Sequence, residues 1–194
     1  MLEFTRRFSM AHRLLEIGST KCAMIHGHNE FVTITMENTN GRRVDWGHSN
    51  IAIQFADAKR KWHDWIDNVV DHALQLGHND PLLQTFMKNE PERIHRIVVT
   101  PGDPTTEIMC LLLAYKCSVF LKGLDLTITK VELEETPTNK VTFHDPIGEF
   151  VIDRVQEKID TLEDWVWLQG GYSRLPDWWA RDDRTINNFD TPVH

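Results

Sequence analysis

The spacing of apolar residues changes several times along the chain, and the order of these changes limits the folds that it can adopt. Alternating apolar and polar residues are typical of strands with one buried face, whereas apolar residues three, four and seven apart are typical of a helix packed on a core. Both patterns occur here. The predicted order is two strands (2–11 and 30–37), two helices (55–70 and 108–121) and two strands (125–136 and 139–145).

The region between the two predicted helices carries no clear period. Residues 78–93 contain several Pro, Asn and Asp residues and are predicted to form a loop with a single helical turn. Residues 96–100 are β-branched but too few to define a motif. This region is therefore predicted to add no strand to the sheet.

Composition restricts the class of protein and its partners. A chain of 194 residues fits one domain with an appendage, and its hydrophobic content of 41% suffices for a core. The net charge of −8 argues against nucleic acid or an anionic membrane as the partner and favours a small molecule. The start of the chain resembles no signal peptide, and no apolar run is long enough to span a bilayer, so we expect a cytoplasmic protein.

The chain is expected to divide near residue 146. Residues 1–145 hold all the strands and helices above and are predicted to form the domain. Residues 146–194 are predicted to be a C-terminal extension, composed of an amphipathic helix and an irregular tail rich in tryptophan. The helix is predicted from the spacing of Val151, Val155, Ile159 and Leu162. Trp165, Trp167, Trp178 and Trp179 are expected to pack over the domain or against a neighbouring chain.

Three histidines fall near the ends of the first two predicted strands. His26 and His28 are two residues apart, so on an extended chain both imidazoles point to the same face. An antiparallel neighbour would bring His12 within reach of them. Three neutral imidazoles suit zinc and leave a fourth position open, which is typical of a catalytic site. Spacing alone leaves a zinc site and a chance grouping equally open, because the chain has 10 histidines.

Cys22 lies four residues before His26, and its role is open on spacing alone. It could be a fourth metal ligand, an inert thiol, or a thiolate stabilised by a nearby dication and Lys21 that acts as a base or nucleophile. Asp71 and His72 offer a second acid/base pair or simply a polar helix end. The other two cysteines, Cys110 and Cys117, are expected to be small buried hydrophobes.

Five motifs taken together resemble the 6-pyruvoyl tetrahydropterin synthase family. They are FSMAH, C-x3-HGH, the DH after the first helix, PTTE before the second helix and EET in the third strand, and they occur in order between Phe4 and Phe143. The resemblance implies an α+β T-fold, in which a four-stranded antiparallel sheet carries two helices on one face. Homo-oligomers, here a tetramer or a hexamer, would close such sheets into a barrel.

The resemblance also implies a role for each matching residue. His12, His26 and His28 would bind Zn²⁺, and Cys22 would be the proton-abstracting thiolate. Asp71 and His72 would form a second proton relay. Glu135 would anchor the amidine-like edge of a pterin, because a carboxylate accepts two parallel N–H bonds. Three residues would form a second pterin-contacting stretch, namely Thr105, Thr106 and Glu107, although Thr105 also suits a helix N-cap.

The substrate implied by the resemblance is 7,8-dihydroneopterin triphosphate. The three residues between Cys22 and His26 resemble the bacterial 6-carboxytetrahydropterin synthases of 7-deazaguanine (queuosine and preQ0) biosynthesis, which also release acetaldehyde and triphosphate. A 6-pyruvoyl tetrahydropterin synthase, which eliminates triphosphate only, is the first alternative. A pterin-binding module without turnover is the second. Arg13 and Lys21 are candidates for binding the triphosphate, because they flank the metal motifs.

Overall fold

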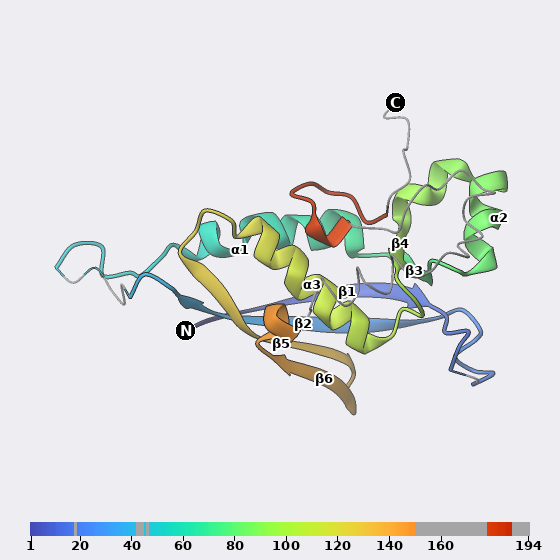
Figure 1. Cartoon of the computed structure of the whole chain (residues 1–194), viewed down its shortest axis with the longest axis horizontal. Coiled ribbons are helices and arrows are strands. Elements are labelled where there is room, and N and C mark those ends of the chain that lie inside the picture. Colours follow the sequence, from blue (N-terminus) through green and yellow to red (C-terminus); the bar gives the residue numbers. More distant parts are fainter. Residues whose placement is uncertain (18, 42–44, 46, 150–177, 188–194) are drawn as a thin grey trace.

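A computed structural model of the chain describes residues 1–17, 19–41, 45, 47–149 and 178–187. Its centre is one six-stranded sheet with the order β4-β3-β1-β2-β5-β6 (Figure 1). The strands are β1 (Leu2–His12), β2 (His26–Asn38), β3 (Ala73–Gly77), β4 (Ile97–Thr100), β5 (Leu126–Thr136) and β6 (Asn139–His144). The helices are α1 (Phe55–Trp65), α2 (Pro81–Asn89), α3 (Thr106–Phe120) and the short α4 (Pro146–Glu149).

The prediction of an α+β fold is confirmed, but the prediction of a four-stranded sheet is wrong. The four predicted strands are β1, β2, β5 and β6, and they pair with one another in antiparallel fashion. Strands β3 and β4 extend the sheet beyond β1 through parallel pairing. All residues of β4 and most of β3 are buried, and a strand covered on both faces shows no alternation that could reveal it.

The region predicted as a loop forms α2 and a following 3₁₀ turn, η2 (Pro91–Arg96). The Asp80 carboxylate accepts a hydrogen bond from the Leu82 amide, and Pro81 occupies the first turn, where no amide hydrogen is needed. Leu83 is fully buried in a second, smaller cluster with residues of β3 and β4. This helix therefore begins at a capping signal and packs on the face of β3 and β4 opposite the main core.

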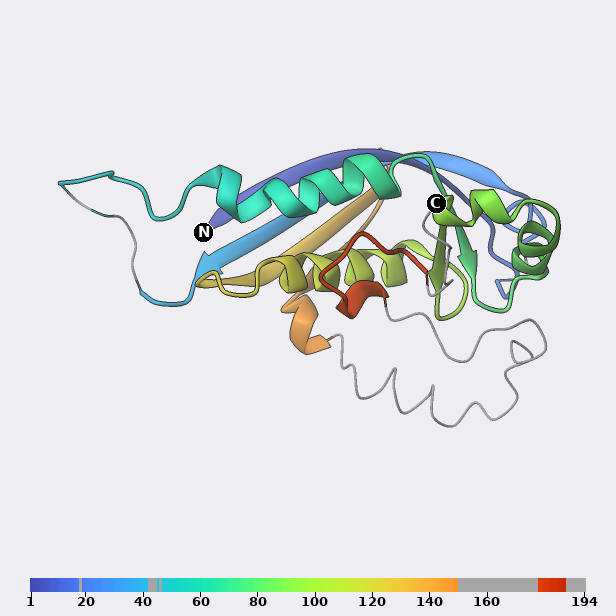
Figure 2. The same ribbon diagram turned by 90° about the horizontal axis from the view of Figure 1, so that it is seen from above.

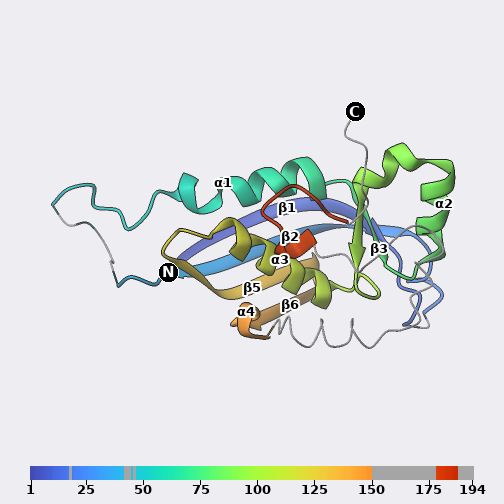
Figure 3. The ribbon, with the colours of Figure 1, turned by 45° about the horizontal axis from the view of Figure 1, so that its top comes forward.

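The two longest helices, α1 and α3, lie over the same face of the long strands (Figures 2 and 3). Even-numbered residues of β1 and β2 point to this face, and Phe8, Val32 and Ile34 among them are almost completely buried. Helix α1 continues as a short π-helical segment, η1 (Ile66–Val70), before the chain enters β3. The helix and sheet together enclose one main core, as the two apolar patterns in the sequence predict.

The described part of the C-terminal extension packs against this helical layer. Residues 178–187, in red, lie across α3 and reach toward β4 (Figure 2). The ring of Trp178 is fully buried, stacks on Trp65 of α1 at 5.7 Å between centroids, and donates from Nε1 to the Val99 carbonyl. The Val99 amide in turn donates to the carbonyl of Ile186. The helix predicted within the extension lies outside the described residues, and the boundary near residue 146 stays a prediction.

A buried lysine holds this C-terminal segment in place. Lys116 of α3 is fully buried, and its Nζ donates to the carbonyl oxygens of Trp178 at 2.8 Å and Arg181 at 2.6 Å. The carboxylate of Asp183 lies 3.8 Å from the same nitrogen. A buried ammonium group is stable only where hydrogen-bond acceptors replace the water that it loses. The buried position of Lys116 therefore depends on the C-terminal segment, and the position of the segment depends on Lys116.

Among the described residues, none of the helices combines the length and the apolar composition that crossing a membrane requires.

Replacing Lys116 by Met should destabilise the protein through the loss of a charged donor to two buried carbonyls. We expect the free energy of unfolding to fall by about 2–4 kcal/mol, as measured by urea denaturation. The control is Lys61→Met, because Lys61 also faces the C-terminal segment but pairs with Asp182 at 3.5 Å in an exposed position. That change should cost about 0.5 kcal/mol or less. Equal effects of the two substitutions would show that Lys116 does not anchor the segment.

Candidate metal centre

The pairing of β1 with β2 brings the three predicted histidines together. In the antiparallel register His12 lies opposite His26, and Met10 lies opposite His28, so all three imidazoles project from the helix-covered face. Their ring centroids are 4.6 to 5.2 Å apart. One ligand nitrogen from each lies within 4.8 Å of the others, which is a spacing that could hold one metal ion.

The close approach of β1 explains why a glycine, Gly27, separates His26 from His28. Gly27 lies opposite Ala11, and a Cβ atom at this position would lie 2.6 Å from the Met10 carbonyl oxygen. Such contact is far inside the van der Waals distance, so a larger residue would force β1 and β2 apart. The HGH motif therefore combines two inward imidazoles with a close approach of the two backbones.

Backbone carbonyls fix the orientation of two of the imidazoles. Nδ1 of His12 lies 3.0 Å from the Pro104 oxygen, and Nδ1 of His26 lies 2.8 Å from the Met24 oxygen. Because a carbonyl can only accept, each Nδ1 carries the hydrogen and each Nε2 of the neutral rings presents a lone pair. These two Nε2 atoms face each other at 3.1 Å. Two lone pairs at this distance repel unless a cation lies between them, so the donor set fits a metal ion.

Burial favours the neutral, metal-binding form of His12. The residue is almost completely buried, and this burial lowers its pKa to about 4, although the Pro104 carbonyl opposes the shift. The positive charges of protonated His26 and His28 would lower the pKa of His12 further, while Glu135 raises it slightly. His12 therefore needs no deprotonation to act as a ligand at neutral pH.

Glu135 lies beside the histidine cluster. Its Oε1 is 3.6 Å from Nε2 of His28 and 4.0 Å from Nε2 of His12. In the part of the chain that the structure describes, neither Lys nor Arg pairs with this carboxylate. Its side chain is one-fifth exposed, so it remains accessible to a ligand.

A second carboxyl group, which sequence reasoning missed, lies deeper on the same face. Glu30 is only 1% exposed, and its Oε2 has no hydrogen-bond partner. Burial, followed by the charge of Glu135, raises the pKa of Glu30 to about 8. The signal for this residue was the strand period, since residues 26, 28 and 30 must share one face.

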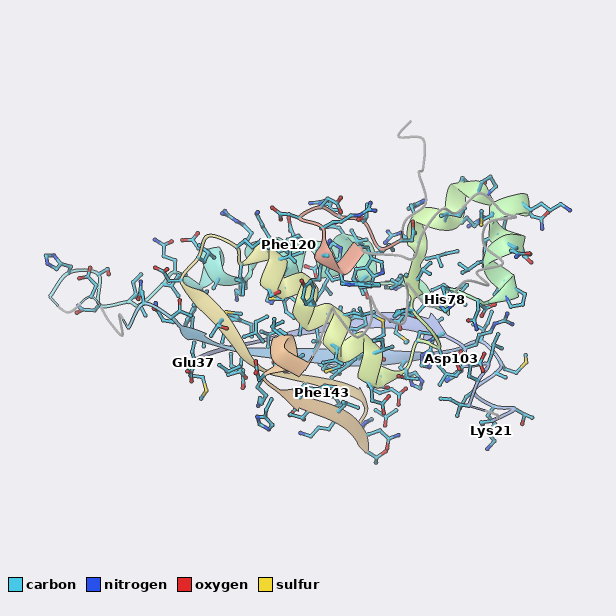
Figure 4. The ribbon with its side chains drawn as sticks, viewed as in Figure 1. Lys21, Glu37, His78, Asp103, Phe120 and Phe143 are labelled. Carbon is cyan, nitrogen blue, oxygen red and sulfur yellow. The ribbon has the colours of Figure 1, made fainter. Side chains whose placement is uncertain are left out.

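Cys22 lies in the loop between β1 and β2, which also carries Lys21. The thiol is free and partly buried, and the Cys22 carbonyl accepts a hydrogen bond from the Leu14 amide. Figure 4 shows Lys21 and Asp103 at the end of the molecule where this loop meets the loop before α3, with Glu37 toward the other end. Within the described residues, no hydrogen bond joins the Cys22 sulfur to the histidines.

The other two cysteines are buried, as predicted. Burial raises the pKa of the Cys110 thiol to about 12, and burial also raises the pKa of Cys117. Neither thiol is therefore suited to act as a nucleophile or base at neutral pH, and Cys22 is the accessible thiol among the three.

Asp71 and His72 form a pair at the edge of β1. The Asp71 Oδ2 atom lies 2.8 Å from Nδ1 of His72, and its Oδ1 accepts from the Ser9 amide at 2.7 Å. Burial raises the Asp71 pKa, but these two hydrogen bonds outweigh it and hold the pKa below its usual value. The His72 backbone has a left-handed φ of 63°, and its side chain is exposed. Across the described ranges, no hydrogen bond or ion pair joins these two residues to the histidine cluster or to Cys22.

The start of α3 lies against the metal site. Thr105 is the N-cap, and its side chain accepts from the Ile108 amide, while Thr106 begins the helix. Glu107 is exposed in the first turn. The preceding residue, Pro104, supplies the carbonyl that binds His12, so the helix start and the cluster form one unit.

Arg13, a candidate for binding the triphosphate, pairs with Asp80. Its guanidinium makes two hydrogen bonds to the Asp80 carboxylate, which also caps α2. This pairing raises the pKa of Arg13. The expectation that Arg13 binds the triphosphate therefore loses support, because its hydrogen-bonding fork is already occupied.

Comparison with known proteins gives the family. Residues 1–146 match the family described as 6-pyruvoyl tetrahydropterin synthase. An uncharacterized protein from Wolinella succinogenes has a similar structure, with a TM-score of 0.59 and 22% identity over 74% of this chain and 97% of that chain. The 6-pyruvoyl tetrahydropterin synthase of Caenorhabditis elegans is similar with a TM-score of 0.50 and 24% identity, covering 74% and 93% of the two chains.

These two likenesses support the fold, and no curated protein sequence gives a significant match. The family match itself extends from β1 to the start of α4 and includes all three histidines of the cluster. Because it covers well over half of the sequence, the chain belongs to the 6-pyruvoyl tetrahydropterin synthase family.

Proposed function

We propose that the protein is a zinc-dependent 6-carboxytetrahydropterin synthase. It would convert 7,8-dihydroneopterin triphosphate and one water molecule into 6-carboxytetrahydropterin, acetaldehyde and triphosphate for 7-deazaguanine biosynthesis. The single observation that carries this proposal is the convergence of three imidazoles next to the Glu135 carboxylate. Family membership supports a pterin substrate at the coarser level.

His12, His26 and His28 would hold the zinc ion. Bound there, zinc would act as a Lewis acid that makes the hydroxyl groups of the substrate side chain more acidic. The three ligands are neutral nitrogen donors, and a site of this kind leaves one coordination position for the substrate. The carbonyls of Pro104 and Met24 would keep two of the rings in the ligand tautomer throughout the reaction.

Cys22 and the Asp71–His72 pair would move protons. Cys22 is the accessible thiol, and its loop begins where β1 ends at His12 and closes where β2 begins at His26. Asp71 would orient the imidazole of His72 through the 2.8 Å contact. Together these groups would remove protons from the substrate side chain and return them as triphosphate leaves.

Glu135 would anchor the pterin ring, and the residues at the start of α3 would support it. The carboxylate can accept two parallel N–H bonds from the amidine-like edge of the ring. Thr105, Thr106 and Glu107 would form the second contact with the ring. The N-cap role of Thr105 is compatible with this, because capping holds the helix start next to the cluster.

A homo-oligomer, either a tetramer or a hexamer, follows from the same proposal. On its outer side, β1 pairs with β3 only over Met10–His12, so residues 2–8 keep an edge that is free of strand partners among the described residues. Strand β6 forms the other edge of the sheet. Pairing of such edges between copies would close the sheets into a barrel.

Product analysis tests the proposed reaction. Purified protein given 7,8-dihydroneopterin triphosphate should release triphosphate and acetaldehyde in equal amounts and leave 6-carboxytetrahydropterin, as detected by mass spectrometry. Triphosphate without acetaldehyde would contradict the carboxy assignment and favour 6-pyruvoyl tetrahydropterin synthase. Binding of the pterin with no product at all would favour the module without turnover.

Cys22→Ala should abolish turnover while the zinc content stays near that of the wild type, because a base is lost and no ligand is. The expected loss in rate is about 100-fold or more. Thr20→Ala, an exposed change in the same loop, is the control and should keep full activity. Loss of zinc in Cys22→Ala would make Cys22 a ligand, and unchanged turnover would remove it from the reaction.

A further inference from the structure

Two carboxyl groups lie side by side under the proposed pterin site, although the function requires only one. Phe31 pairs with Glu134 and Val32 pairs with Leu133, so one further step in this register would place Glu30 opposite Glu135, and the charge of Glu135 acts on Glu30. Side chains in such cross-strand positions have Cβ atoms roughly 5 Å apart. Val32 and Leu133 are both fully buried on the helix-covered face, and Glu30 and Glu135 share that face through the strand period.

Glu30 is the more deeply placed of the two. Its side chain is 1% exposed, and its Oε2 makes no hydrogen bond within the described residues. The Glu135 side chain is one-fifth exposed, as is the neighbouring His28. Glu30 is thus less exposed than Glu135 and His28 and as buried as His12, which places it at the floor of the site.

A buried acceptor without a partner is costly, because it has lost its hydrogen bonds to water. Across the described ranges, neither Lys nor Arg forms an ion pair with Glu30 or Glu135. Within the described residues, Glu135 therefore has only the histidines beside it, and Oε2 of Glu30 has no hydrogen-bond donor. A ligand rich in N–H donors would compensate both.

We propose that Glu30 is a positioning residue of the ligand site, which accepts an N–H of the bound heterocycle beside Glu135 and selects rings that carry a 2-amino group. This inference rests on the proposed function, since it takes Glu135 as the anchor of the ring. The guanidine-like edge of a pterin has more N–H donors than one carboxylate can accept in parallel. Glu135 accepts two of them, and Glu30 accepts the outer hydrogen of the amino group.

The proposal requires a 2-amino group on the ring of the ligand. A 2-oxo analogue such as lumazine presents a carbonyl oxygen where pterin presents the amino group. Where Glu30 accepts as a carboxylate, no hydrogen lies between it and that oxygen, and the site should bind lumazine more weakly than pterin. The ratio of the affinities for pterin and lumazine therefore reports on Glu30 more directly than either affinity does.

The test measures pterin and lumazine binding by fluorescence titration of the full chain. Glu30→Leu should weaken pterin binding by about 10-fold or more and change lumazine binding little, so that the ratio of affinities collapses. Glu30→Gln keeps the shape and should weaken pterin binding by about 5-fold, because it retains a neutral acceptor. Glu135→Gln should weaken pterin binding more than either, with its zinc content unchanged.

Glu134→Gln is the matched control, because Glu134 lies on the other face of the same strand and should alter neither affinity. Thermal unfolding of each variant separates misfolding from lost contacts, and if Glu30→Leu fails to fold, the isosteric Glu30→Gln decides. An unchanged ratio in the folded Glu30 variants, with pterin binding lost in Glu135→Gln, would overturn this inference and leave the proposed function intact. No pterin binding by the wild type would overturn both.

Discussion

The antiparallel register between β1 and β2 is the constraint on which the candidate site depends. It sets His12 opposite His26 and places His28 one step further on the same face. A slip by one residue would turn one strand's side chains to the opposite face and separate the ligands. Gly27 secures this register, since a side chain there would collide with the Met10 carbonyl. The sheet core beyond it, centred on Val32 and Ile34, keeps the two strands in the same phase.

The helical layer is coupled to the site through polar contacts rather than through apolar packing alone. The Pro104 carbonyl, directly before α3, holds the imidazole of His12, and Lys116 further along α3 holds the C-terminal segment. The start of α3 therefore orients His12, a candidate metal ligand, and a residue further along the helix holds the buried C-terminal segment. Each contact satisfies a buried polar group, so neither layer can shift without leaving one unpaired.

The long elements of the fold were predictable, whereas the short ones were not. β1, β2 and α1 each carry an apolar period and α3 is a long apolar run, but β3 and β4 are short, are buried on both faces and show no period. α2 carried a readable signal in Asp80 and Pro81, which the surrounding turn-forming residues obscured. Trp178 was expected to pack over the domain or on a neighbour, and its place against α1 depends on long-range contacts that no local pattern encodes.

Some residues of the candidate site were predictable from the sequence, and others were not. His12, His26 and His28 were predictable as a group from strand geometry, and the resemblance to a family gave them a metal. Strand spacing places Glu30 on the face of His26 and His28, but its role and that of Pro104 depend on contacts between elements far apart in the sequence. Proximity of Cys22 or His72 to the cluster also remains a prediction.

X-ray absorption at the zinc edge of the purified protein tests the central claim most directly, because it identifies the atoms around the metal. The account predicts one zinc per chain with three imidazole nitrogens at about 2.0–2.1 Å and no sulfur neighbour, and loss of this signal in His12→Gln. A sulfur atom at about 2.3 Å, or the absence of bound metal in protein supplied with zinc, would contradict it.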